Sequence, residues 1–143
     1  MDLRQITPDF AVAPQITPED VAQAAALGYR TLINNRPDTE VDDQIDSAAM
    51  AAAAAAAGMA YHHLPYFPGA LTPELVAGFE GVMAEAEGPV LAYCRSGTRS
   101  SHLWAMWQAG QQQPIPAIVG AAAAAGYDHT GLVPLLQQHA ENN

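Results

Sequence analysis

One short stretch of this sequence gathers the residue types that perform covalent chemistry. It reads Y-C-R-S-G-T-R-S from Tyr93 to Ser100 and contains the only cysteine of the chain, Cys94. A thiolate is a strong nucleophile, and nearby arginines stabilise it. A lone cysteine is most often a buried structural residue. Two arginines, a glycine and three hydroxyls within seven residues do not suit a dry core, so we favour a functional cysteine.

The neighbouring segments predict how Cys94 is positioned. Gly88-Pro89 is a turn before the apolar run Val90-Leu91-Ala92, which is typical of a buried strand. After the loop, the apolar-rich residues 102–107 predict a helix. The first amides of a helix have no partner within it, so they would point at the sulfur, and the helix dipole would stabilise a thiolate there.

Composition limits the class of protein and its partners. The 143 residues fit one domain, residues 1–143, and the net charge of −10 argues against nucleic acid and anionic membranes as partners. All five basic residues are arginine, and two of them lie in the cysteine loop. A single cysteine excludes intramolecular disulfides and a multi-cysteine metal site, and no cofactor is expected. Neither a membrane span nor a secretory signal is apparent, so the expected location is the cytoplasm.

The order of predicted elements indicates the fold class. Strands are expected at 10–13, 30–35, 59–64 and 88–92, and helices at 17–27, 42–57, 72–87, after Arg99, 116–125 and 130–140, while residues 1–9 are expected to be a lead-in. Such alternation predicts a three-layer α/β fold with a mainly parallel sheet of four to five strands flanked by helices. Ligands of these sheets bind beyond the carboxyl ends of the strands, where Cys94 would lie.

The spacing within the loop suggests two kinds of enzyme. Protein tyrosine and dual-specificity phosphatases place five residues between the cysteine and the arginine, whereas the loop of rhodanese-type sulfurtransferases is one residue shorter. Four residues separate Cys94 from Arg99, so the loop itself resembles the rhodanese type. We assign Cys94 and Arg99 as catalytic residues. The expected anion-binding loop comprises Arg95, Ser96, Gly97, Thr98 and Ser100, with the Ser100 hydroxyl able to hydrogen-bond the sulfur.

Nearly the whole chain resembles one family. The carrying motifs are I-T-P-D-F-A-V-A-P-Q-I-T-P-E-D at 6–20, L-I-N-N-R-P-D at 32–38, A-Y-C-R-S-G-T-R-S at 92–100 and A-A-A-A-G-Y-D at 122–128. They resemble the phosphatase-like domain that occurs alone or fused to β-lactamase-like hydrolases of bacterial sulfide oxidation. The resemblance implies a dual-specificity-phosphatase fold with a rhodanese-like loop, and a β-lactamase-like sulfur dioxygenase as a functional partner.

The acid required by a phosphatase is missing from its usual place. Such enzymes carry an aspartate about thirty residues before the cysteine to protonate the leaving group. No aspartate occurs here between Asp46 and Asp128. We therefore favour sulfur transfer from thiosulfate or glutathione persulfide through a Cys94 persulfide to a thiol or sulfite acceptor, because these leaving groups need no acid. Phosphate hydrolysis is the alternative, and a non-catalytic anion-binding or thiol-sensing module is the second alternative.

Three further residues are expected at the rim of the pocket. Arg36 and Asp38 end a predicted strand, and His63 ends another, so all three should lie near the carboxyl edge of the sheet. Arg36 serves equally well as a second anion contact or as part of a structural turn. The pair His62-His63 lacks a third ligand in register, so a metal site is not expected.

Overall fold

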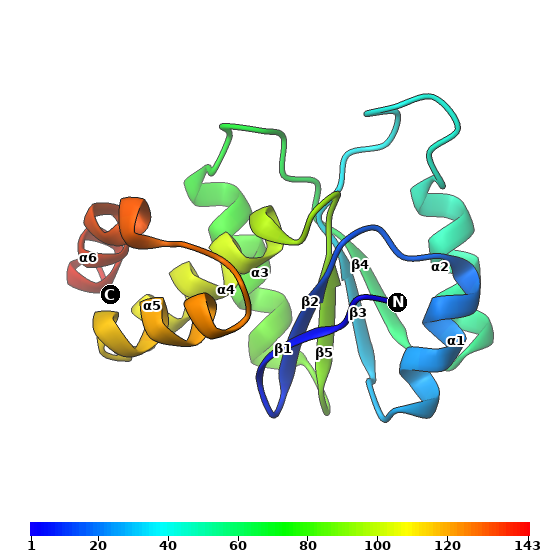
Figure 1. Cartoon of the computed structure of the whole chain (residues 1–143), viewed down its shortest axis with the longest axis horizontal. Coiled ribbons are helices and arrows are strands. Elements are labelled where there is room, and N and C mark those ends of the chain that lie inside the picture. Colours follow the sequence, from blue (N-terminus) through cyan, green and yellow to red (C-terminus); the bar gives the residue numbers. More distant parts are fainter.

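A five-stranded sheet organises the chain in the computed structural model, which describes all of residues 1–143 (Figure 1). The strands lie in the order β1-β2-β5-β3-β4. Their bounds are Arg4–Thr7 (β1), Phe10–Ala13 (β2), Thr31–Asn34 (β3), Ala60–His63 (β4) and Val90–Tyr93 (β5). Strands β2 to β5 run parallel, whereas β1 is antiparallel to β2. The predicted α/β fold with a mainly parallel sheet is confirmed.

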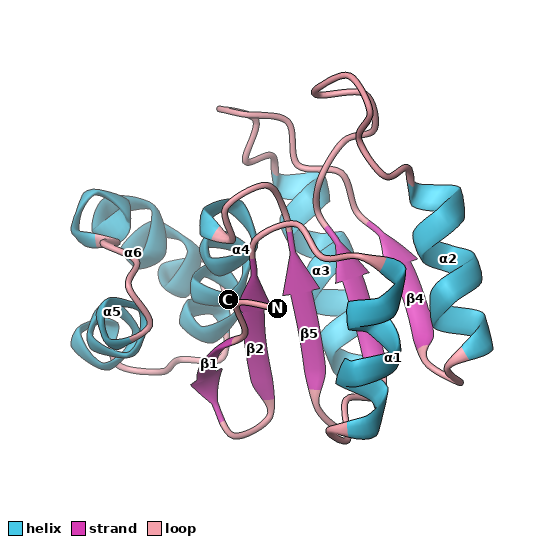
Figure 2. Cartoon of the chain, turned by 45° about the vertical axis from the view of Figure 1, so that its right-hand side comes forward, coloured by secondary structure: helices cyan, strands magenta, loops and turns pink.

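Helices cover both faces of the sheet, which gives the three layers. They are α1 (Pro18–Ala26), α2 (Ser47–Ala56), α3 (Pro73–Glu85), α4 (Thr98–Gly110), α5 (Ile115–Ala124) and α6 (Val133–Glu141). Figure 2 shows α1 and α2 on one face and α3 and α4 on the other, with α5 and α6 beyond α4. No helix has the length and apolar character needed to cross a bilayer.

Strand β5 is buried on both faces, as its apolar sequence predicts. Val90 and Ala92 belong to the core under α3 and α4, whereas Leu91 and Tyr93 belong to the core under α1 and α2. This alternation is the two-residue period of a strand. Because β5 lies between β2 and β3, the residue that follows it emerges at the middle of the sheet. That residue is Cys94.

In the N-terminal half of the chain, the first strand and the start of α2 differ from the prediction. The expected lead-in contains β1, an edge strand whose half-exposed polar residues lack the apolar alternation of a buried strand. The helix expected from residue 42 begins only at Ser47, because Asp46 caps it by accepting from the Ala49 N–H at 2.9 Å. The acids before it lie in a loop instead, with Asp43 at a φ of 63°.

The C-terminal helix is also shorter than expected. Residues Thr130–Leu132 form one 3-10 turn, and α6 starts after it at Val133. Pro134 falls in the first turn of α6, where its missing N–H costs no hydrogen bond. Helix α4, which follows the cysteine loop, is present as predicted. Trp104 on this helix is buried in the core, and Trp107 packs against the core half-buried.

Candidate active site

The cysteine loop occupies the carboxyl edge of the sheet. In the parallel register, Tyr93 at the end of β5 pairs with Ala13 at the end of β2 and Asn34 at the end of β3. Cys94 follows directly and is fully buried, and helix α4 begins four residues later at Thr98. The predicted strand–cysteine–helix arrangement is therefore present. Gly97 caps α4 without any side-chain acceptor, so it places no competing group among the first amides of the helix.

A backbone amide of the loop contacts the sulfur. The Gly97 N–H donates to Cys94 Sγ at 3.1 Å. Gly97 has a φ of 91°, and a β-carbon at this position would collide with the Tyr127 hydroxyl. Glycine is thus required both for its left-handed backbone and for space. An N–H aimed at the sulfur can stabilise negative charge that develops on it during a reaction.

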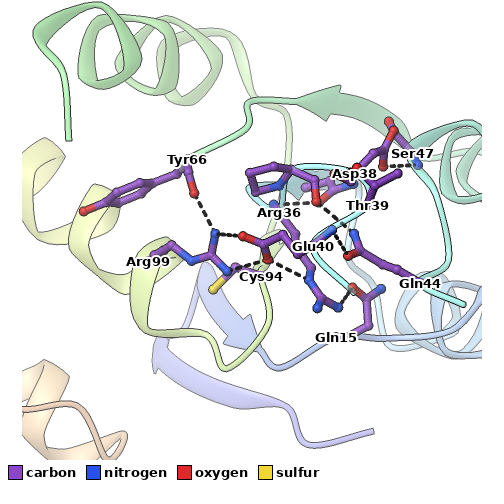
Figure 3. Close-up of polar contacts among 12 residues, drawn as sticks. Gln15, Arg36, Asp38, Thr39, Glu40, Gln44, Ser47, Tyr66, Cys94 and Arg99 are labelled. Atoms are coloured by element: carbon purple, nitrogen blue, oxygen red, sulfur yellow. Dashed lines mark hydrogen bonds and ion pairs between the residues drawn. The ribbon is translucent and has the colours of Figure 1, made fainter. Parts of the chain in front are cut away.

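Arg99 is held beside the sulfur by two partners (Figure 3). Its Nη1 and Nη2 donate to the two carboxylate oxygens of Glu40, each at 2.9 Å, and Nη1 also donates to the Tyr66 carbonyl at 2.7 Å. A guanidinium has five N–H groups, so Nε–H and one Nη2 hydrogen stay free along one edge. Figure 3 shows the Cys94 sulfur on the side of the guanidinium away from the Tyr66 carbonyl. That edge can therefore bind two oxygens of an anion next to the Cys94 sulfur.

The charges of this cluster favour a permanent cation at Arg99. Burial alone would lower the pKa of Arg99, but the hydrogen bond to Glu40 and the charge of Cys94 outweigh burial, so the pKa is raised. The same hydrogen bond from Arg99 lowers the pKa of Glu40 despite partial burial, with help from Arg36. Glu40 thus stays ionised at neutral pH. It orients Arg99 and has no proton to give to a leaving group.

Arg36 contacts Glu40 and not the cysteine loop. It is buried; its Nε donates to Glu40 at 2.9 Å and its Nη1 donates to Gln15 at 3.0 Å. Of the two roles expected for Arg36, the structure shows contacts that support Glu40 and shows none in the loop. Gln15 is joined to the loop directly, because its N–H donates to the Arg95 carbonyl at 3.2 Å.

The two other rim residues also contact the scaffold. Asp38 is exposed and accepts from the Ser47 N–H at 2.8 Å, at the start of α2. His63 Nε2 lies 2.9 Å from the Arg36 carbonyl. Both residues come from segments that end at the carboxyl edge, as predicted, but their recorded contacts fix the 36–47 loop and not the Cys94 loop. The clusters of His, Cys, Asp and Glu include no group of three that could hold a metal ion.

The hydroxyls of the loop do not all behave as expected. Ser96 and Thr98 are exposed, and the Ser96 hydroxyl donates to that of Thr98 at 3.1 Å. Ser100 is buried and donates to Asn35 Oδ1 at 2.8 Å, so the expected hydrogen bond from Ser100 to the sulfur is wrong. The reason is that Asn35 uses its amide nitrogen on the Leu64 carbonyl, which leaves its oxygen in need of a donor.

The loop after β4 supplies an aromatic residue where an acid would be needed. Tyr66 is buried there, and its hydroxyl lies 3.0 Å from His102 Nδ1. Burial raises the pKa of Tyr66. Burial, with the charge of His129 adding to it, lowers the pKa of His102 to about 4. His102 is therefore neutral at physiological pH. Residues 64–72 contain no Asp or Glu, which agrees with the missing aspartate in the sequence.

Four residues of the site were missed from the sequence: Glu40, Tyr66, Tyr127 and His129. Glu40 follows Arg36 by four residues, but this spacing is informative only in a helix, and both lie in a loop. Tyr66 lies in the loop after β4, for which the sequence predicted no site residue. The other two lie after α5, about thirty residues from the cysteine, and no local pattern connects them to it.

Comparison with known proteins identifies relatives of the chain. Residues 2–111 match the model of the family described as "Beta-lactamase hydrolase-like protein, phosphatase-like domain". A β-lactamase hydrolase-like protein of Xylella fastidiosa is 36% identical over 106 residues, which is 74% of this chain. The match covers only 25% of the Xylella protein, so this chain spans about a quarter of the length of that relative.

Solved structures place the fold among cysteine phosphatases of the dual-specificity type. A candidate phosphatase from Neisseria meningitidis Z2491 is 35% identical with a TM-score of 0.84, covering 97% of this chain and 99% of that one. Kinase associated phosphatase, solved with serine in place of its catalytic cysteine, is 11% identical with a TM-score of 0.75. The match covers 93% of this chain and 86% of that one. The matches support the phosphatase alternative at least as well as sulfur transfer, and they confirm neither reaction.

Proposed function

Because the chain belongs to the phosphatase-like domain family of β-lactamase hydrolase-like proteins, we propose that it is a cysteine-dependent phosphatase for esters with good leaving groups. One observation carries the proposal: the free edge of Arg99 lies beside a sulfur that already accepts an amide N–H. This arrangement supports binding of a tetrahedral oxyanion, with the nucleophile next to the central atom.

The proposed reaction has two steps. The Cys94 thiolate attacks phosphorus, the bond from phosphorus to the ester oxygen breaks, and the oxygen leaves with the electron pair. Arg99 and the loop amides stabilise the charge on the other phosphoryl oxygens. Water then attacks the phosphocysteine, the phosphorus–sulfur bond breaks, and inorganic phosphate and the thiolate are released.

The lack of a protein acid restricts the substrate. Glu40 is ionised and paired with two arginines, and the 64–72 loop holds no carboxyl group. An alkoxide would therefore leave without a proton, which is slow, whereas a phenolate of low basicity leaves readily. The same lack leaves the attacking water without a general base. Hydrolysis of the phosphocysteine should then limit turnover on the best substrates.

A series of aryl phosphates tests this proposal. The rate of the first step should rise steeply as the pKa of the leaving phenol falls, and alkyl phosphates should be almost inert. On nitrophenyl phosphate the release of phenol should show a burst, followed by a slower steady state. Hydrolysis of alkyl and aryl phosphates at similar rates would show that an acid participates, which would contradict the proposal.

Sulfur transfer is the second candidate, and the four-residue spacing from Cys94 to Arg99 favours it. In this reaction the Cys94 thiolate attacks the outer sulfur of thiosulfate, the sulfur–sulfur bond breaks, and sulfite leaves with the electron pair. A thiol or sulfite acceptor then removes the outer sulfur from the Cys94 persulfide. Glutathione persulfide is the other expected donor, and a β-lactamase-like sulfur dioxygenase is the proposed functional partner. Neither step requires a protein acid.

The two candidates leave different covalent traces. Thiosulfate should add the mass of one sulfur atom to the wild-type chain if sulfur transfer operates, and cyanide should remove this mass. An aryl phosphate should add one phosphoryl group if the phosphatase proposal is right. A sulfur adduct with fast turnover and no phosphoryl adduct would assign the loop to sulfur transfer.

A further inference from the structure

One peptide unit of the cysteine loop is held at both of its polar ends. This is the peptide between Ser96 and Gly97, whose N–H donates to Cys94 Sγ at 3.1 Å. Its carbonyl, the Ser96 oxygen, accepts from the Tyr127 hydroxyl at 3.2 Å. The N–H and C=O of a trans peptide point in opposite directions. The residue that fixes the carbonyl therefore also fixes the direction of the N–H.

The backbone at this position needs such a constraint. Gly97 has a φ of 91°, and glycine changes between left-handed and right-handed backbone conformations at little cost. Rotation of the Ser96–Gly97 peptide would turn the carbonyl oxygen toward the sulfur and the N–H away from it. A carbonyl dipole in that orientation repels a thiolate and any bound anion. The chemistry of the loop thus depends on the orientation of one peptide.

Tyr127 is itself firmly placed. It is buried, its ring stacks on that of His129 with centroids 6.4 Å apart, and the guanidinium of Arg4 lies 5.1 Å above its ring. Burial raises the pKa of Tyr127, so the phenol keeps its proton and can donate. Its hydroxyl lies against Gly97, since a β-carbon on that glycine would collide with it.

His129 supports the first turn of α4 through the Ser101 hydroxyl. The Ser101 hydroxyl donates to the Thr98 carbonyl at 2.6 Å, so its oxygen must accept from His129 Nε2, which lies 2.9 Å away. Nε2 of His129 therefore carries a proton, and burial lowers the pKa of His129, which favours the neutral ring. Its Nδ1 is buried without a partner, which agrees with this assignment. The segment after α5 thus contacts Ser96 in the cysteine loop and Ser101 in the first turn of α4.

We propose that Tyr127 is a positioning residue: its hydroxyl keeps the Ser96–Gly97 peptide turned so that the N–H faces the Cys94 sulfur. The inference rests on the proposed function in treating Cys94 as the reactive thiolate, but it does not depend on which group Cys94 transfers. It also gives the segment after α5 a role in the site, although the family match ends at residue 111.

The test removes the hydroxyl oxygen of Tyr127 and measures the titration and the alkylation rate of the Cys94 thiol. In Tyr127→Phe the ring, its stacking on His129 and its contact with Arg4 are kept. The titration of Cys94, followed by thiolate absorbance, should move to higher pH. Alkylation by iodoacetamide at a pH below the midpoint should be about tenfold slower, the size expected for one hydrogen bond to a charged group.

Tyr61→Phe is the matched control. It also removes a phenolic hydroxyl, but this one contacts Ser47 and Asn34 and not the loop. Thermal melts of both variants should lie within a few degrees of the wild type, and Tyr61→Phe should titrate as the wild type does. An unchanged titration in Tyr127→Phe, or equal shifts in both variants, would overturn the proposal.

The readout separates this inference from the proposed function. A shifted titration in Tyr127→Phe in a protein that hydrolyses no aryl phosphate would refute the phosphatase and keep the positioning role. Normal titration together with Cys94-dependent hydrolysis would refute the positioning role alone. Circular dichroism of each variant shows whether the fold is intact, and a melt of Tyr127→Phe far below that of Tyr61→Phe would mean that the hydroxyl serves the fold, which also contradicts the proposal.

Discussion

The carboxylate of Glu40 holds the guanidinium of Arg99 through two hydrogen bonds of 2.9 Å each, although 59 residues separate them in the chain. The pair occupies one edge of the guanidinium, and the Tyr66 carbonyl occupies a second. The third edge is left for an anion. Glu40 and Tyr66 thus determine which of the five N–H groups of Arg99 stay free for an anion.

Glu40→Gln should weaken catalysis by releasing Arg99. A neutral amide offers only one acceptor oxygen and leaves the charges of Arg36 and Arg99 uncompensated. We expect kcat/KM on an aryl phosphate to fall about tenfold to hundredfold, about 1.4 to 2.7 kcal/mol. The control is Glu80→Gln, whose carboxylate pairs with His139 on α6. Equal activities of the two variants would refute the role of Glu40.

Arg99 and Arg95 should contribute unequally. Arg99 lies beside the sulfur, whereas Arg95 is exposed and attracts anions only at a distance. Arg99→Ala should lower kcat/KM by about a thousandfold, and Arg95→Ala by less than about tenfold with a weaker dependence on salt. Kinetics at low and high ionic strength measure both effects. Similar losses in the two variants would mean that the division of roles is wrong.

Gly97→Ala should inactivate the loop. The added methyl group meets the Tyr127 hydroxyl, and alanine disfavours a φ of 91°. We expect loss of activity and a stability decrease of about 1–3 kcal/mol by urea unfolding. Gly120→Ala is the control, because Gly120 lies within α5 with open space around it, and alanine there should stabilise by about 0.5–1 kcal/mol. An active Gly97→Ala enzyme would contradict the assigned loop geometry.

Stability should decrease in mild acid because of His102. Its pKa falls from 6.5 to about 4 on folding, so the unfolded chain binds more protons between these values, and stability is lost as the pH falls from about 6.5 to about 4. His102→Gln keeps an acceptor for the Tyr66 hydroxyl but cannot titrate.

The comparison of these two chains isolates the contribution of one imidazole. Between about pH 7 and about pH 4.5, the free energy of unfolding should fall by about 1–2 kcal/mol more in the wild type than in His102→Gln. This value is smaller than the full effect of the pKa shift, because the imidazole is only partly buried. Urea titrations at the two pH values measure the difference. Parallel losses in both chains would show that His102 does not carry the acid sensitivity.

The sequence predicted the parts of the site that are local in the chain. Cys94, Gly97 and Arg99 lie within six residues between an apolar strand and an apolar helix, and both patterns are legible without a structure. The helix starts expected at residues 17 and 72 agree with the structure to within one residue. There Thr17 and Thr72 cap α1 and α3, because each threonine hydroxyl accepts from the backbone N–H three residues later. Local chemistry thus predicted the fold class, which the structure confirms, and pointed to the cysteine loop as the candidate site.

The residues that support the loop could not be predicted in this way. Glu40 reaches Arg99 from a loop in which Thr39 and Asp43 have positive φ, and the run of acids there was assigned to a helix. Tyr127 contacts Ser96 across 31 residues. Contacts of this kind depend on how the elements pack, and neither spacing nor propensity encodes them.

Intact mass spectrometry of the chain after brief incubation with an aryl phosphate and rapid denaturation tests the central claim, that Cys94 is the nucleophile. In the proposed mechanism no acid or base assists the second step, so the phosphocysteine should accumulate. We expect the mass of one phosphoryl group on the wild type, mapped to Cys94, and no adduct on Cys94→Ser, which should fold normally and be inactive. Turnover by Cys94→Ser, or wild-type turnover with no adduct on Cys94, would contradict the account.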